Sequence, residues 1–175
     1  MNKDNKASKE DAYKNLELVN SWINNIDLKA SFILAFLGIL LGNILNLNNI
    51  EILKKFVTVP INTMSLIEIL RIIVIILLLV SSMISTVLLI LTLVARTKIN
   101  DIPRSNYFFG NIANMDRKEF LMNFERMNEK TIKNEILNQV YVNSKICNYK
   151  SKLYNKSINY MLVTVILTFI NYILG

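Results

Sequence analysis

One uninterrupted apolar stretch constrains this chain more than any other feature of its sequence. Residues 72–95 are 24 positions without a charge, and 17 of them are Leu, Ile or Val. An α-helix rises 1.5 Å per residue, so this stretch crosses the hydrocarbon core of a bilayer, roughly 30 Å thick, with a little to spare. The aliphatic side chains together favour insertion by about 5–10 kcal/mol, which outweighs the few Ser and Thr residues among them. The stretch is therefore predicted to be a transmembrane helix.

Two further charge-free runs predict two more spans, one before and one after this stretch. Glycine and proline are scarce, at four and two residues, which argues against a strand-and-turn architecture. The predicted fold class is an all-α membrane protein with three transmembrane helices and a helical cytoplasmic portion. The predicted division is an N-terminal amphipathic helix (1–29), a first span (30–50), an external loop (51–66), a second span (67–95), a cytoplasmic helical region (96–156) and a third span (157–174).

Local signals predict how several of these segments begin and what they contact. Ser8 and Asp11 have the spacing of a capping box, so a helix should start there. The Asn and Pro residues of 47–66 predict a loop. Glu68 and Arg71 are three residues apart and are predicted to pair at the mouth of the second span.

The third span carries a polar stripe, formed by Tyr160, Thr164, Thr168 and Asn171 at helical spacing. Hydrocarbon offers no hydrogen-bond partner, so this face is predicted to lie against other helices or water.

The first span carries a stripe of small residues that includes Gly38 and Gly42. Small residues allow helices to approach closely in lipid. Two interpretations remain open: packing against the second span of the same chain, or an interface between copies in a homo-oligomer.

Composition argues against catalysis. The chain has no histidine and a single cysteine, which removes the commonest general base and metal ligand and excludes an internal disulfide. No nucleotide-binding loop, zinc motif or nucleophile motif occurs in it. We expect no enzyme activity, no metal, no cofactor and no nucleic-acid partner. The net charge of +7 suits a membrane surface or an anionic ligand.

The distribution of Lys and Arg predicts the orientation. Five precede the first span, two lie in 49–66, and twelve lie in 96–156 against six acidic residues. Because basic residues collect on the cytoplasmic side, the N-terminus and 96–156 are predicted to be cytoplasmic.

Three motifs, in order, resemble the small transmembrane effector family of Pycsar, the bacterial antiphage system built on pyrimidine nucleotide cyclases. Residues 22–31 resemble the family's Trp…Asp-x-Lys-Ala pattern through Trp22, Asp27 and Lys29. Residues 107–113 resemble its aromatic-Phe-Gly-Asp-Ile-Ala pattern, with Asn111 in place of Asp, so a role that requires a carboxylate there does not carry over. Residues 139–146 resemble its Gln-Ile-x-x-Asn-Ser-x-Ile run.

The resemblance covers roughly residues 20–174 and implies a protein held inactive until a cyclase makes cyclic UMP or cyclic CMP after phage infection. Members are then expected to impair the inner membrane, so the implied partners are the cyclic nucleotide, the lipid bilayer and the cyclase. The alternative is a non-catalytic, membrane-anchored interaction subunit that docks a cytoplasmic partner protein.

A cyclic mononucleotide carries one phosphate diester and a flat base, so its site needs a cation, amide groups and an aromatic face. The ligand-binding candidates of these types are Arg104, Tyr107, Phe108, Asn143, Lys145 and Lys150. A second set is predicted to couple or pack the helices: Trp22, Asp27, Lys29, Gly38, Gly42, Gly110 and Gln139. Of these, Asp27 and Lys29 are expected to contact the cytoplasmic helices.

Overall fold

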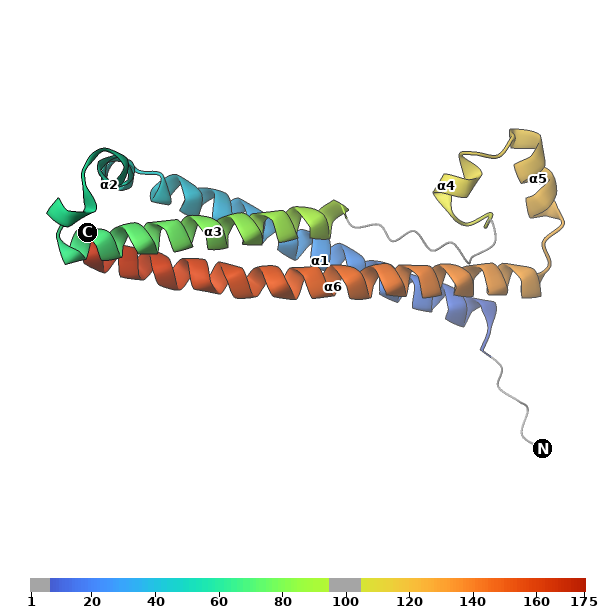
Figure 1. Cartoon of the computed structure of the whole chain (residues 1–175). Helices are drawn as coiled ribbons and strands as arrows, with labels where there is room; N and C mark the ends of the chain where they lie inside the picture. Colours follow the sequence, from blue (N-terminus) through green and yellow to red (C-terminus); the bar gives the residue numbers. More distant parts are fainter. Residues whose placement is uncertain (1–6, 95–104) are drawn as a thin grey trace, which may run out of the picture. The chain divides into compact units, whose positions relative to one another are not determined.

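The computed structural model describes residues 7–94 and 105–175, so 1–6 and 95–104 lie outside the account below. All the regular secondary structure in these residues is helical (Figure 1). The elements are α1 (Lys9–Ile44), α2 (Leu47–Thr58), the short 3-10 helix η1 (Ile61–Thr63), α3 (Leu66–Val94), α4 (Phe109–Ile112), α5 (Arg117–Glu125) and α6 (Glu129–Leu174).

Three helices, α1, α3 and α6, are long and apolar enough to cross a membrane. No strand occurs in the part of the chain that the structure describes. The predicted fold class, an all-α membrane protein with three transmembrane helices, is confirmed.

The chain divides into two compact units. The first, which we call the polar unit, holds the described residues of 1–25 and 95–149. The second, the membrane unit, holds Ile26–Val94 and Lys150–Gly175. Helices α1 and α6 contribute residues to both units, because each runs without a break from a polar half into an apolar half.

The membrane unit is centred on α3. Its most apolar stretch is 44% buried, against 11% for those of α1 and α6. Ala30 and Leu37 of α1 pack with Leu89 of α3, and the three side chains are fully buried. The outer faces carry large apolar side chains such as Phe32 and Ile173, which are about four-fifths exposed and suit contact with lipid tails.

The start of α1 follows the predicted capping box. The Asp11 carboxylate accepts hydrogen bonds from the Ser8 amide and hydroxyl at 2.8 and 2.9 Å, and the Ser8 hydroxyl accepts from the Asp11 amide at 3.1 Å. These contacts lower the pKa of Asp11, chiefly through the Ser8 N–H. The first half of α1 buries Ala12 and Val19, which lie seven residues apart on one face of the helix.

The predicted loop over 47–66 is wrong for its first part, which forms α2. The Asn46 side chain accepts a hydrogen bond from the Asn49 amide at 2.9 Å and so caps the helix. Asparagine favours both turns and N-caps, and here the cap is followed by apolar residues at helical spacing. The later part, from Pro60 to Ser65, is irregular apart from η1.

In the polar unit, short α4 and α5 lead into α6. The Asp116 side chain accepts from the Lys118 amide at 3.2 Å and so caps the start of α5. Lys133 of α6 donates to the carbonyl of Ala7, and Lys9 lies 4.0 Å from Glu129. The beginning of α1 is therefore held beside the beginning of α6.

Candidate functional site

A buried ion pair ties the three long helices of the membrane unit together. The Lys150 ammonium on α6 donates to both carboxylate oxygens of Asp27 on α1, at 2.6 and 2.8 Å. It also donates to the carbonyl of Leu93, in the last turn of α3, at 3.3 Å. An ammonium has three N–H donors, so each of them has a partner in the protein. The Lys150 side chain is only 6% exposed, against 33% for Asp27.

The position of this pair follows from a seven-residue repeat on α6. Lys150 lies seven residues after Asn143, which donates to the side chain of Asn20 at 2.7 Å in the polar unit. Asp27 likewise lies seven residues after Asn20, so both pairs are separated by 123 positions along the chain. Two parallel helices with matched seven-residue repeats give this relation, and polar pairs at such positions fix the register of the helices.

The repeat continues through the membrane unit at Ser157, Thr164 and Asn171, and we call Lys150 with these three the polar row. The Ser85 hydroxyl on α3 donates to the Ser157 carbonyl at 2.9 Å. The hydroxyls of Ser81 and Thr164 lie 2.9 Å apart. Ser157 and Thr164 are fully buried, and α3 runs alongside the second half of α6 (Figure 1). The polar stripe on the third span therefore faces α3 at Thr164, as predicted, whereas Tyr160 is 40% exposed.

The polar row ends in a cluster at the beginning of α3. The buried Asn49 side-chain oxygen accepts from Arg71 at 3.2 Å and from Asn171 at 3.4 Å. Its amide group donates to the carbonyl of Ile44 at 2.8 Å. The Nε of Arg71 and the Oδ1 of Asn171 are buried and have no hydrogen-bond partner in the described residues. Arg71 also borders a hollow of about 290 Å³ beside α2.

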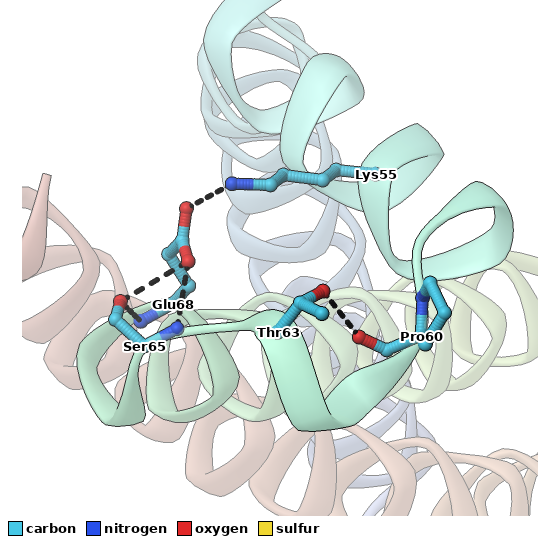
Figure 2. A network of polar contacts seen from close by, with 5 residues as sticks. All are labelled: Lys55, Pro60, Thr63, Ser65 and Glu68. Atoms are coloured by element: carbon cyan, nitrogen blue, oxygen red, sulfur yellow. Dashed lines mark hydrogen bonds and ion pairs between the residues drawn. The ribbon is translucent and has the colours of Figure 1, made fainter.

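The prediction that Glu68 pairs with Arg71 is wrong. Figure 2 shows the partners that Glu68 has instead, Ser65 and Lys55. Glu68 accepts from the Ser65 amide at 2.9 Å and from its hydroxyl at 3.1 Å, a capping box that starts α3. The same carboxylate bonds Lys55 of α2 at 2.5 Å. Glu68 thus faces the helix start and α2, and in the described residues no carboxylate forms an ion pair with Arg71.

In the polar unit, Tyr107 lies in an aromatic cluster. Its ring centroid is 6.4 Å from that of Tyr13 and 6.3 Å from that of Phe124, and the Tyr107 and Tyr13 hydroxyls lie 3.3 Å apart. Burial, followed by the hydrogen bond with Tyr13, raises the pKa of Tyr107 to about 12. The phenol therefore stays protonated and keeps its O–H donor at neutral pH.

The residues just before Tyr107 are held by Glu135 of α6. Its carboxylate accepts from the Ser105 hydroxyl at 3.0 Å and from the Asn106 amide at 2.8 Å. The Asn106 side-chain carbonyl is buried without a hydrogen-bond partner in the described residues. An aromatic ring and an unpartnered amide acceptor therefore lie on adjacent residues of one segment.

The remaining ligand-binding candidates are each described by their own surroundings, and one of them lies outside the described residues. Phe108 is 39% exposed, and Arg104 lies outside the described residues. The Lys145 ammonium sits 5.1 Å from the ring centroid of Tyr141 in a cation–π contact on α6. In the described residues, the side chains of Tyr107 and Asn143 bond different partners, Tyr13 and Asn20 respectively.

The coupling candidates divide in the same way. Asp27 lies in the buried ion pair, whereas Trp22 is half exposed and Lys29 is exposed. Gln139 is buried on α6. A Cβ at Gly110 would lie 2.8 Å from the Phe108 ring, so the small residue permits that close approach.

Gly38 and Gly42 lie on the exposed side of α1, and a Cβ added to either would meet no atom within 4 Å. The interpretation that these glycines pack against the second span of the same chain is therefore wrong. The interface between copies stays a prediction.

Sequence reasoning missed the partners of the polar row on other helices, namely Ser81, Ser85 and Asn49. The seven-residue spacing of Asn143, Lys150, Ser157, Thr164 and Asn171 was the signal that could have linked them.

Comparison with known proteins covers almost the whole chain. The Pycsar effector protein domain, PycTM, matches residues 11–175. The Pycsar effector protein GmPycTM of Gulbenkiania mobilis is 34% identical over 192 aligned positions, which cover 95% of this chain and 94% of that protein. No solved structure gives a significant match.

Proposed function

The chain belongs to the family of Pycsar effector proteins, which serve in antiphage defence, and on that premise we propose that a cyclic pyrimidine mononucleotide, cUMP or cCMP, triggers it to impair the inner membrane. The nucleotide is the product of a partner pyrimidine cyclase. The effector itself carries out no catalysis, and membrane damage stops growth of the infected cell.

The observation that carries this proposal is the buried Lys150–Asp27 pair among the long helices. A membrane anchor needs apolar helices and nothing more. Burying the Lys150 charge costs several kcal/mol of desolvation, which its contact with the partly exposed Asp27 offsets only through good geometry and additional hydrogen bonds. An ion pair that depends on the exact placement of α1, α3 and α6 suits a unit that changes between a closed and an open arrangement.

The polar unit is the part of the protein that binds the nucleotide in this proposal. The segment 96–156, most of which belongs to the polar unit, carries twelve basic and six acidic residues, which favours an anion. Uracil offers an N–H donor and cytosine an amino group, and the unpartnered Asn106 carbonyl is an acceptor for either. Tyr107, adjacent to it, offers an aromatic face and a protonated hydroxyl. Asn143 and Lys145 remain candidates for the phosphate.

The orientation is part of the proposal. The count of five, two and twelve basic residues favours a cytoplasmic polar unit, where the cyclase product is released. The Arg71 end of the membrane unit is then external.

The test has a cellular and a biochemical arm. In cells that carry the effector, an active pyrimidine cyclase should depolarise the inner membrane, measured with a potential-sensitive dye, and an inactive cyclase should not. Purified effector should bind cUMP or cCMP in calorimetry more tightly than cyclic AMP. Asn106→Ala should weaken binding about tenfold or more, the usual effect of losing a buried hydrogen bond.

Asn134→Ala is the matched control, because Asn134 is an exposed asparagine on α6. It should bind like the parent. If the effector binds no cyclic nucleotide and the cyclase causes no depolarisation, the membrane-anchored interaction subunit becomes the better explanation.

A further inference from the structure

The polar row runs the full depth of the membrane unit. Lys150 and Asn171 are 21 positions apart on one helix, about 32 Å, which matches the hydrocarbon thickness of a bilayer. Resting on the function proposed above, we propose that this row lines the path by which small inorganic anions cross the membrane once the unit opens. The Lys150–Asp27 pair closes the path at its Leu93 end.

The hydroxyls of the row have a second acceptor within their own helix. Thr164 donates to the Tyr160 carbonyl at 2.9 Å and Ser157 to the Tyr154 carbonyl at 2.7 Å. On the α3 side, Ser81 can donate to the Leu78 carbonyl at 3.1 Å. When α3 and α6 separate, these hydroxyls keep a hydrogen bond, so opening leaves none of them stranded.

Three buried polar atoms of the membrane unit are positioned to bond water. Arg71 Nε, Asn171 Oδ1 and Thr86 Oγ1 are buried polar atoms of the membrane unit without a partner in the described residues. A polar group in a dry apolar interior loses its hydrogen bond to water without compensation. Water beside these atoms removes that loss, and two of the three lie at the Arg71 end of the row.

Fixed charge sets the selectivity. When the ion pair opens, Asp27 stays with α1, and the charges that remain at the two ends of the row, on α6 and α3 respectively, are the Lys150 ammonium and the Arg71 guanidinium, both positive. Positive groups at a constriction favour anions over cations. Chloride is therefore expected to pass in preference to potassium.

Close packing of small polar side chains is the competing explanation for the same row. The two explanations differ in whether water reaches the row in the active protein. A thiol placed on the row reports this, because charged thiosulfonate reagents modify only hydrated thiols. The native Cys147 is first replaced by Ser.

The experiment uses Thr164→Cys in proteoliposomes made with the full chain, with cUMP or cCMP on the polar-unit side. Ser81→Cys on α3 is the second variant, in case the first does not fold. Ile166→Cys is the matched control, because Ile166 lies on α6 but is 59% exposed on the lipid-facing surface. Nucleotide should raise the modification rate of either row variant at least about tenfold and leave that of the control unchanged. Modification of a row variant should then reduce the ion flux. Chloride flux should exceed potassium flux.

Three results would overturn parts of this reasoning. If the nucleotide opens the liposomes but neither row variant reacts faster than Ile166→Cys, the row is packing only and the path lies elsewhere, while the proposed function stands. If potassium passes as readily as chloride, the assigned selectivity is wrong. If the parent protein shows no nucleotide-dependent flux of any ion, the proposed function fails together with this inference.

Discussion

The ion pair of the membrane unit should give unequal costs when its two partners are removed in turn. Asp27→Ala leaves the Lys150 ammonium, 6% exposed, with the Leu93 carbonyl as its one remaining partner among the described residues. An uncompensated buried charge of this kind costs about 3–5 kcal/mol. Lys150→Met keeps the apolar stem and leaves Asp27, one-third exposed, within reach of water. Its cost should be about 1–2 kcal/mol, near the lower end for an unsatisfied polar group.

The double variant Asp27→Ala with Lys150→Met removes both charges and should be less destabilised than Asp27→Ala alone. The coupling between the two sites should reach about 2 kcal/mol, within the range for residues in direct contact. The assay is unfolding of the purified protein in mixed micelles by increasing detergent, followed by circular dichroism.

The exposed pair of Lys55 and Glu68 in the same unit supplies the control. Removing either partner should change the free energy of unfolding far less, because both side chains reach solvent. Equal costs for Asp27→Ala and Lys150→Met, or a double variant no better than Asp27→Ala, would refute the account of a buried, mutually dependent pair.

Three further predictions concern orientation, assembly and the start of α1. A topology reporter at Asn128 should behave as cytoplasmic and one at Gly175 as external; a cytoplasmic result at Gly175 would contradict the three-span arrangement. Gly38→Ile combined with Gly42→Ile should leave the single chain folded, because a Cβ at either position would meet no other described part of the chain within 4 Å. The double variant should reduce assembly in detergent sizing if copies meet there; unchanged assembly and toxicity would assign the stripe to lipid. Since the pKa of Asp11 is lowered below its usual 3.8, its capping contribution should be present above that value and be lost as the pH falls through the lowered one; amide exchange at the start of α1 that does not change across this window would contradict the cap.

The sequence alone determined the elements whose formation depends on nearby residues. Insertion of a helix sums the transfer free energies of its own side chains, so three spans could be predicted without knowing what they contact. Capping is equally local, which explains why Ser8 and Asp11 predicted the start of α1. The same local reading failed at Asn46, because asparagine serves both a loop and the cap of α2.

Only the tertiary structure decided which polar groups meet. In the sequence Lys150 is a candidate for binding the ligand, yet the register of α1 and α6 places it on Asp27, 123 positions away. Arg71 has a carboxylate three residues before it, but the cap of α3 and Lys55 occupy that carboxylate and Arg71 bonds Asn49 instead. Partner choice depends on the rotation and offset of one helix against another, and those follow from the packing of all three helices at once. A periodic pattern in one helix gives the face that is polar, but not the residue that lies opposite.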